Sequence, residues 1–380
     1  MKPDTEAALA DIVKSAKGPL AIQGGGTRGL SPRGDLLSVA GLSGITLYEP
    51  GALTMVAQAG TPISEIEAAL AAENQRLAFE PMDHRAVLGT QGDPTLGGVI
   101  SANVSGPRRI QGGSARDYAL GVRFVDGTGT AVKNGGRVMK NVTGYDLVKL
   151  MCGAFGTLGV LTEVSLKVLP SPETQGTLML RGLDDVAGVR AMSAAMGSPY
   201  EITGAAHCAK IMEGGSVTAL RIEGFETSVV YRMDRLKDLL KGFNADMNVA
   251  DATMSDWIWK SVRDATLLAE VPEDIWRVCC KPSDAPALMA RSGAVGWYFD
   301  WAGGLIWVRM PAGDDLRASL GAFDGHATLV RASEATRAAL PTFHPEAPGV
   351  AKISAGLRAR FDPRGILNPG LMGPVAREVA

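Results

Sequence analysis

Glycine is concentrated in three clusters of this chain, and these clusters constrain the fold more than any other feature. The sequence holds 47 glycines in 380 residues, well above the usual share, and they are densest in residues 24–29, 92–106 and 153–159. Because glycine has no side chain, it permits turns with positive φ and lets the backbone approach another group closely. We therefore expect many backbone turns or a ligand site lined by backbone.

The overall composition is that of a folded globular protein. Hydrophobic residues make up 46% and charged residues 21%, and the length suffices for two or three domains. The net charge is −2, and acidic and basic residues are scattered along the chain. This excludes the basic footprint of a nucleic-acid-binding protein and favours a small or neutral partner. No apolar run predicts a transmembrane helix, and residues 1–6 lack the features of a signal peptide. We expect a cytoplasmic protein.

The four cysteines do not predict a metal site. Cys152, Cys208, Cys279 and Cys280 are irregularly spaced and contain no Cys-x-x-Cys, so we expect neither a disulfide framework nor a zinc site. Any iron–sulfur cluster must then belong to another chain. The adjacent pair at 279–280 lies in an apolar run, which is typical of buried structural thiols, with redox sensing as the alternative.

The first glycine cluster imitates a dinucleotide-binding fingerprint without its structural context. Residues 24–29 match G-x-G-x-x-G, and Glu49 follows 20 residues after the match, where that fingerprint has its acid. However, Pro32 interrupts the helix that such a loop must begin. The loop can still bind phosphate through successive backbone amides, helped by the Thr27 hydroxyl and the Arg28 charge. The alternative is a plain tight turn.

The second and third clusters are harder to explain as turns alone. In residues 92–106 the glycines are interspersed with side chains that can form hydrogen bonds with a ligand, namely Thr95, Ser101, Asn103 and Ser105. Residues 153–162 read GAFGTLGVLT and begin a strand-like run. Together the two segments predict a ligand cradle.

In this order, the segments resemble the FAD-binding domain of the vanillyl-alcohol-oxidase, or PCMH-type, flavoproteins. That family has an early glycine loop, then T-x-G-G-x-x-x-x-N-x-x-G, then F-G-T-L-G-V-[IL]-T, and residues 20–170 carry all three. Residues 361–370 look like its C-terminal return to the flavin. The resemblance implies a pyrophosphate loop formed by Gly24, Gly25, Gly26, Thr27 and Arg28. It implies a cofactor cradle formed by Thr95, Leu96, Gly97, Gly98, Ser101, Asn103 and Gly106. It also implies that the backbone beside the flavin comes from Gly156, Thr157, Leu158, Gly159 and Val160, and that Asn368 contacts the ring system.

Further polar residues near the cradle have two interpretations, cofactor contact or structural ion pairs and core packing. These residues are Arg116, Asp117, Lys140 and Tyr145. The family often links its flavin covalently to a histidine near the first loop or to a cysteine near the second. Here His84 is remote from residues 24–29 and Cys152 lies at the third cluster, so the resemblance implies non-covalent FAD.

After about residue 172 the glycine clusters give way to alternating helices and strands. We expect helices at 184–196, 227–240, 255–265 and 284–291, and strands at 217–222, 276–280, 295–299, 305–310 and 328–330. Two successive strand–helix–strand units predict a ferredoxin-like layer of helices on an antiparallel sheet. All six tryptophans lie here and either pack in the core or line a ligand site.

The predicted fold class is therefore α+β with three parts. A two-subdomain FAD-binding domain spans 1–171, with subdomains at about 1–85 and 86–171. A cap domain spans 172–335. A C-terminal segment, 336–380, contains a helix from Ile353 and returns to the flavin.

The cap lacks the catalytic motif of self-sufficient relatives. Stand-alone family members that oxidise 2-hydroxy acids carry an H-x-G-D-G-N-x-H-like motif, whereas residues 321–331 keep only His326 and Arg331. The metal ligands are lost, and we expect no metal. His326 is either structural or a proton-handling group near the flavin. Arg331 and Arg309 either anchor a substrate carboxylate or form solvated ion pairs.

The short cap and reduced motif resemble the FAD-binding subunits of three-component glycolate oxidases. The resemblance implies oxidation of glycolate, a small 2-hydroxy acid, to glyoxylate beside a larger FAD-containing homologous subunit and an iron–sulfur subunit. Such partners can also hold a cytoplasmic chain at a membrane. The alternatives are a stand-alone flavin oxidase or dehydrogenase and a non-catalytic flavin-binding assembly subunit. A nicotinamide dehydrogenase would need the missing helix after the first loop.

Overall fold

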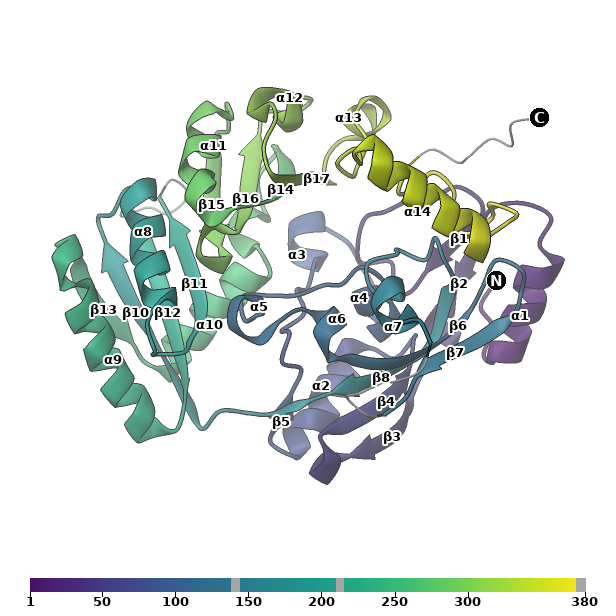
Figure 1. The fold of residues 1–380 in the computed structure, drawn as a ribbon, viewed down its shortest axis with the longest axis horizontal. Coiled ribbons are helices and arrows are strands. Elements are labelled where there is room, and N and C mark those ends of the chain that lie inside the picture. The colour runs from purple at the N-terminus through teal and green to yellow at the C-terminus, as the bar shows by residue number, and fades with distance from the viewer. Residues whose placement is uncertain (138–143, 210–214, 374–380) are drawn as a thin grey trace.

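The chain folds into two lobes, each built around its own sheets (Figure 1). The computed structural model describes residues 1–137, 144–209 and 215–373. The first half of the chain forms a two-stranded and a five-stranded sheet, and residues 174–331 form an eight-stranded sheet. The mixture of helices with largely antiparallel sheets confirms the predicted α+β class.

The first glycine loop connects two strands, not a strand and a helix. β1 (Leu20–Gln23) pairs in parallel with β2 (Asp35–Ser38), and residues 24–34 between them form turns, bends and irregular backbone without a helix. This agrees with the effect expected of Pro32. Helix α1 (Glu6–Ser15) covers the pair by burying Leu9 and Val13 against it.

The five-stranded sheet forms the centre of the first lobe. Its neighbours are antiparallel, in the order β3 (Ile45–Glu49), β4 (Thr54–Gln58), β8 (Val160–Lys167), β6 (Ala119–Val125) and β7 (Ala131–Gly135). A minor pair joins β5 (Gln75–Arg76) to β9 (Leu169–Pro170). The connecting helices are α2 (Ile63–Ala72), α3 (Arg85–Leu88), α4 (Leu96–Ser101), α5 (Arg109–Gly112), α6 (Ala115–Tyr118) and α7 (Leu147–Met151).

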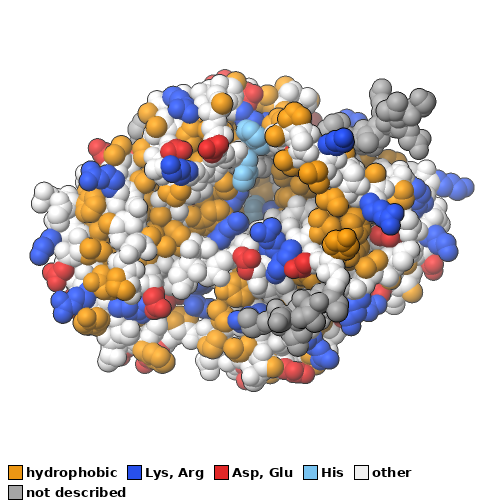
Figure 2. Space-filling view, in the orientation of Figure 1, with side chains coloured by type: hydrophobic (Ala, Val, Ile, Leu, Met, Phe, Trp, Pro, Cys, Tyr) orange, Lys and Arg blue, Asp and Glu red, His pale blue; other side chains and the backbone are white. Residues whose placement is uncertain are grey.

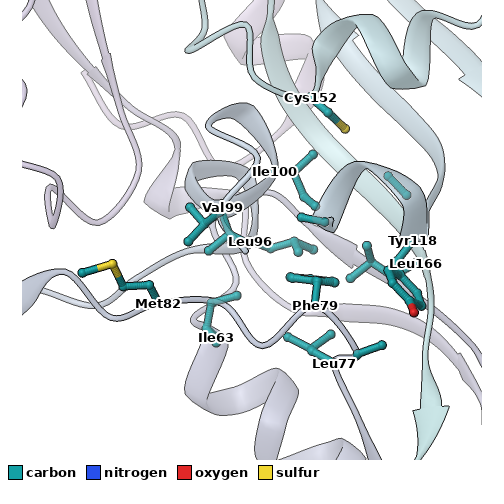
Figure 3. Close-up of a cluster of buried hydrophobic side chains, with 14 of the residues drawn as sticks. Ile63, Leu77, Phe79, Met82, Leu96, Val99, Ile100, Tyr118, Cys152 and Leu166 are labelled. Carbon is teal, nitrogen blue, oxygen red and sulfur yellow. The ribbon is translucent and has the colours of Figure 1, made fainter. Parts of the chain in front are cut away.

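The short helix α4 lies inside the second glycine cluster, where the sequence had predicted only a cradle. Leu96, Val99 and Ile100 on α4 pack into the cluster of buried side chains drawn in Figure 3, which also includes Phe79 and Ile63. Because three of its six residues hold their side chains in the core, α4 is fixed relative to the sheet, and its opposite face is turned toward the first glycine loop.

The eight-stranded sheet consists of two ferredoxin-like units joined edge to edge. The first runs β10 (Thr174–Arg181), α8 (Asp185–Met196), β11 (Ile202–Cys208), β12 (Val217–Gly224), α9 (Glu226–Leu240), β13 (Asp246–Ala250). After α10 (Ala252–Arg263), the second runs β14 (Asp274–Cys280), α11 (Ala285–Arg291), β15 (Gly296–Asp300), β16 (Leu305–Met310), α12 (Leu316–Leu320), β17 (Gly325–Arg331). The spatial order is β13-β10-β12-β11-β15-β16-β14-β17, with β11 and β15 forming the junction.

The two faces of this sheet have different partners. Trp276 and Val278 on β14 point to the face covered by the helices α8, α9, α11 and α12, where they join one hydrophobic core. Ile275 and Cys279, one residue out of phase, belong to the core shared with the first lobe. Alternation along β14 therefore turns Arg277 and Cys279 toward the first lobe.

The C-terminal segment returns to the first lobe, as Figure 1 shows. After α13 (Glu334–Ala339), helix α14 spans Pro348–Phe361, so the helix expected from Ile353 begins earlier than predicted. The chain then reaches β1, where Leu20 N donates to Ile366 O at 2.7 Å and Leu20 bridges to Leu367. Residues 366–367 are thereby attached beside the first glycine loop.

Candidate cofactor and substrate site

Two adjoining cavities lie beside the first glycine loop, and only the second of them reaches the eight-stranded sheet of the other lobe. The first, which we call the loop cavity, has a volume of about 380 Å³ and is lined by the first glycine loop and α4. The second, the cap cavity, has about 360 Å³ and is bordered by the eight-stranded sheet. Both are lined by Arg28, Leu30, Met82, His84, Ala102 and Phe155. Figure 2 shows a hollow between the lobes edged by histidine and basic side chains.

The first glycine loop lines the loop cavity and packs tightly against the second cluster. Gly24, Gly25, Gly26, Thr27 and Arg28 all border this cavity. A Cβ on Gly25 would lie 1.6 Å from the Asp93 carbonyl oxygen, and one on Gly24 would lie 2.2 Å from Thr95 Oγ1. The glycines are therefore required by the contact between the two loops, as well as by the cavity.

The second cluster contributes to both cavities, although not with every predicted residue. Thr95, Gly98 and Ser101 line the loop cavity, while Asn103 and Gly106 line the cap cavity. Thr95 also caps α4 by accepting a hydrogen bond from Gly98 N at 3.4 Å.

Two predicted members of the cradle face elsewhere. Leu96 is fully buried in the core. Gly97 packs on Ala59, where a Cβ would approach the Ala59 side chain to 2.8 Å.

The third cluster departs from the prediction most clearly. Phe155, with φ +50°, borders both cavities, whereas residues 156–160 line neither. Thr157 donates to Ala154 O at 2.7 Å, Leu158 is buried in the main core, and Gly159 packs on Phe124. Val160 begins β8, and Gly156 lies against Asn368. The predicted residues support the cavity wall, and the preceding aromatic ring forms it.

Asn368 connects the C-terminal return to β1 and to the third glycine cluster. Its Oδ1 accepts from Ile22 N at 2.7 Å and its Nδ2 donates to Phe155 O at 2.9 Å. It is 3% exposed and also lines the loop cavity. Its side-chain amide thus holds the wall in position and has little capacity left for a ligand.

Four polar residues near the cradle were open to two interpretations, cofactor contact or structural role. Those of the four that the structure describes do not border the cavities. The Arg116 backbone donates to Asn103 Oδ1 at 2.9 Å, so Arg116 orients a residue that does. Asp117 forms a capping box with Ser114 at the start of α6. Tyr145 is 88% exposed. Lys140 lies outside the described residues.

His84 is remote from the first loop in sequence but not in space, which corrects our expectation. Its Nε2 lies 3.5 Å from Arg28 Nη1, and both residues border both cavities. Burial and the Arg28 charge hold the pKa of His84 well below its ordinary value, so the ring is neutral. Burial, with repulsion from Arg277, lowers the pKa of Arg28 to about 10.

The cap cavity carries an excess of positive charge that the sequence analysis missed. Arg109 and Arg277 stack on the ring of Trp301, with guanidinium carbons 4.7 and 5.1 Å from its centroid. Neither they nor Arg28 form an ion pair with a carboxylate in the part of the chain that the structure describes. Burial raises the pKa of the nearby Asp300 to about 7, so this acid is only partly ionised near neutral pH and offsets only part of the charge.

Among the candidate catalytic residues, His326 faces the cap cavity and Arg331 does not. His326 on β17 lies opposite Cys279 on β14, and both line the cavity. Arg331 donates to five backbone carbonyls between residues 87 and 273, which ties β17 to the loops beside it. Arg309 pairs with Glu273 at 2.7 Å. Neither arginine is placed to anchor a ligand in the cavities.

Within residues 1–137, 144–209 and 215–373, no group of three or more His, Cys, Asp or Glu side chains could hold a metal ion. Nor does any helix within those ranges have the length and apolar character needed to cross a membrane.

Comparisons with known proteins agree with the geometry of the loops. The family described as "FAD binding domain" matches residues 1–135. Glycolate oxidase subunit GlcE of Escherichia coli (strain K12) is 34% identical over 97% of both chains. Glycolate oxidase subunit GlcD of Bacillus subtilis (strain 168) is 44% identical over 22% of this chain and 18% of its own length.

The fold also matches solved structures. The 4-ethylphenol oxidase from Gulosibacter chungangensis has a TM-score of 0.71 at 12% identity, covering 98% of this chain and 88% of that chain. At this identity the likeness concerns the fold alone.

Proposed function

This chain belongs to the family of the glycolate oxidase subunit GlcE, and from that premise we propose that it is an FAD-binding subunit of a complex that oxidises glycolate to glyoxylate. The observation that supports this most directly is the continuous pair of cavities. One end is lined by glycine backbone, and the other carries three guanidinium groups without ion pairs among the described residues.

The loop cavity fits the diphosphate and ring system of FAD. Bare backbone at residues 24–26 permits close approach, and Thr27, Thr95 and Ser101 provide hydroxyl groups along the wall. Asn103 and Gly106 continue this lining toward the cap cavity. When bound, FAD would accept a hydride and pass its electrons on singly.

The cap cavity fits a small carboxylic acid. The guanidinium groups of Arg109 and Arg277 would bind the carboxylate, since a charge-assisted pair inside a cavity is stronger than in water. His326 stands on the same wall as a group that can take up the hydroxyl proton. Phe155, Leu305 and Trp307 restrict water around them. The substrate class is therefore a short 2-hydroxy acid.

The partners belong to the same proposal. We infer a larger FAD-containing homologous subunit and an iron–sulfur subunit, with activity only in the complex, in the cytoplasm or held at a membrane by the partners. The division of the chain at 171 and 335 also stays a prediction.

We also infer that the FAD is non-covalent, although His84 borders the cavities. Acid precipitation should release the flavin into the supernatant, and flavin retained in the pellet would contradict this.

Anaerobic reduction of the flavin tests the function. The purified chain should show the two absorption bands of an oxidised flavin, and glycolate should bleach them when the two partner subunits are present. Bleaching of the isolated chain at the same rate would instead indicate a stand-alone dehydrogenase. A complex that keeps full activity after this chain has lost its FAD would indicate an assembly subunit.

A further inference from the structure

Cys279 and His326 form a pair that the oxidation of a 2-hydroxy acid does not require. They occupy opposite positions in the antiparallel register of β14 and β17, where side chains on one face lie about 5 Å apart at Cβ. Both border the cap cavity, and Arg277 lies on the same face two positions along β14. The thiol therefore has an imidazole and a guanidinium as immediate neighbours.

These neighbours favour the thiolate. Burial alone would raise the pKa of Cys279, but the positive charge of Arg277 and a hydrogen bond with His326 outweigh it and lower the pKa to about 7. The other charged or titratable groups that line this cavity are Arg28, His84, Arg109, Arg263 and Asp300. Three of these five are arginines and His84 is neutral, and a thiolate is the form that such surroundings stabilise.

The adjacent Cys280 provides an internal contrast. It points to the other side of the strand, where its thiol donates to Gly303 O at 3.6 Å. Burial, together with Cys279 and Asp284, raises the pKa of Cys280 to about 12. Near neutral pH a substantial share of Cys279 is therefore thiolate, whereas the adjacent Cys280 stays protonated.

We propose that Cys279, assisted by His326, is a nucleophilic site that reversibly binds a small anionic aldehyde, the class to which a 2-oxo acid such as glyoxylate belongs. The choice of ligand rests on the proposed function. The site itself rests on the cross-strand pair and on the arginines around it, which attract an anion.

The reaction is an addition and needs no oxidant or reductant. The sulfur forms a bond to the aldehyde carbon, the carbonyl π bond breaks, and its oxygen takes the proton that His326 carries. The product is a thiohemiacetal, and the reverse steps release the aldehyde and return the proton to His326. While the adduct exists, its carboxylate occupies the positions near Arg109 and Arg277, so the oxidised product competes with the next substrate molecule.

Isotope-labelled glyoxylate tests the proposal on the FAD-loaded full chain by carbon NMR. We expect a thiohemiacetal resonance, distinct from that of the hydrated aldehyde, that is lost in Cys279→Ser and retained in the matched control Cys280→Ser. Flavin absorption shows whether each variant is folded. His326→Gln should retain the thiol yet weaken the adduct by more than about tenfold, because the proton donor is gone. Absence of the resonance from the native chain would overturn the proposal.

Alkylation gives a second readout that does not depend on glyoxylate. At pH 7, iodoacetate should label Cys279 more than about tenfold faster than Cys280, as measured by peptide mass spectrometry, because the thiolate is the reacting form. Iodoacetate should also react faster than neutral iodoacetamide at Cys279. Equal labelling of the two cysteines would overturn the proposal. A chain that forms the adduct but is not reduced by glycolate within the complex would support this site while contradicting the proposed function.

Discussion

Asn368 accepts a hydrogen bond from the backbone of Ile22 at 2.7 Å, across 346 residues of sequence. The same side chain donates to Phe155 O, so a single amide connects β1, the third glycine cluster and the C-terminal return. Phe155 borders both cavities, and its ring also packs edge-on against Phe343 with centroids 4.8 Å apart. The wall between the cavities therefore depends on a residue near the end of the chain.

Replacing this amide should weaken both FAD binding and the stability of the fold. In Asn368→Leu both Ile22 N and Phe155 O lose their partner, at about 1–3 kcal/mol for each buried group, and leucine is strained at φ +44°. We expect loss of bound FAD and a lower free energy of unfolding in urea. Asn368→Asp keeps the acceptor but not the donor, so its loss should be smaller. Full FAD content in Asn368→Leu would contradict this role.

The glycine-rich turns could be predicted from sequence because the glycines of each cluster are close together along the chain. The absence of a helix after the first loop followed from Pro32, and the ferredoxin-like cap followed from alternating helical and strand periods. For the third glycine cluster, the sequence did not show which residues face the cavity. There Phe155 and Gly156 both have positive φ, and this turns the aromatic ring inward and the following residues into the core.

The residues of the cap cavity escaped prediction for a different reason. His84, Arg109 and Arg277 come from separate elements, and only the packing of the lobes brings them together. A usable signal did exist on β14, since strand alternation places Arg277 and Cys279 on one face. The arginine that the sequence offers as a carboxylate anchor, Arg331, has a guanidinium occupied by backbone carbonyls. Sequence alone does not show whether an arginine is already paired.

A Cβ on Gly25 should weaken FAD binding. In Gly25→Ala the added carbon would lie 1.6 Å from the Asp93 carbonyl oxygen, so the loop must move away from the second cluster. We expect the dissociation constant for FAD, measured by fluorescence quenching, to rise more than about tenfold. The matched control is Gly51→Ala, where a Cβ meets nothing within 4 Å. Equal affinities in the two variants would show that the contact between the loops does not shape the site.

The two lobes are joined by a buried ion network, and removing one acid from it should destabilise the protein. Arg221 donates to both oxygens of Glu80 at 3.0 Å, and Arg108 pairs with Glu80 at 3.0 Å and with Glu223 at 2.7 Å. Glu80→Gln leaves buried arginine charge uncompensated, which costs about 3–5 kcal/mol. Urea unfolding measures this loss. Glu201→Gln is the control, because Glu201 is 71% exposed in its pair with Arg232 and should change stability by less than about 1 kcal/mol.

The same network should make stability depend on acid pH. Burial would raise the pKa values of Glu80 and Glu223, but Arg221 and Arg108 outweigh it and lower both below their ordinary value of 4.5. A depressed pKa stabilises the fold fully above the unfolded-state value, and this stabilisation is lost as pH falls below about 4.5. Unfolding free energies measured between pH 7 and pH 3 should therefore fall less steeply in Glu80→Gln than in the native chain. Identical slopes would exclude these carboxylates as the cause.

Arg277 should determine how well the complex uses its substrate. Its guanidinium lies over Trp301 on the wall of the cap cavity, without a carboxylate partner among the described residues. Arg277→Gln removes a charge-assisted contact worth about 1.5–3 kcal/mol, so kcat/KM for glycolate should fall about 10- to 100-fold, chiefly through KM. Arg309→Gln is the matched control, because Arg309 on β16 pairs with Glu273 outside both cavities. Steady-state kinetics of the reconstituted complex, with FAD content checked for each variant, measure both. If Arg277→Gln leaves KM unchanged while Arg309→Gln raises it, the substrate carboxylate binds elsewhere.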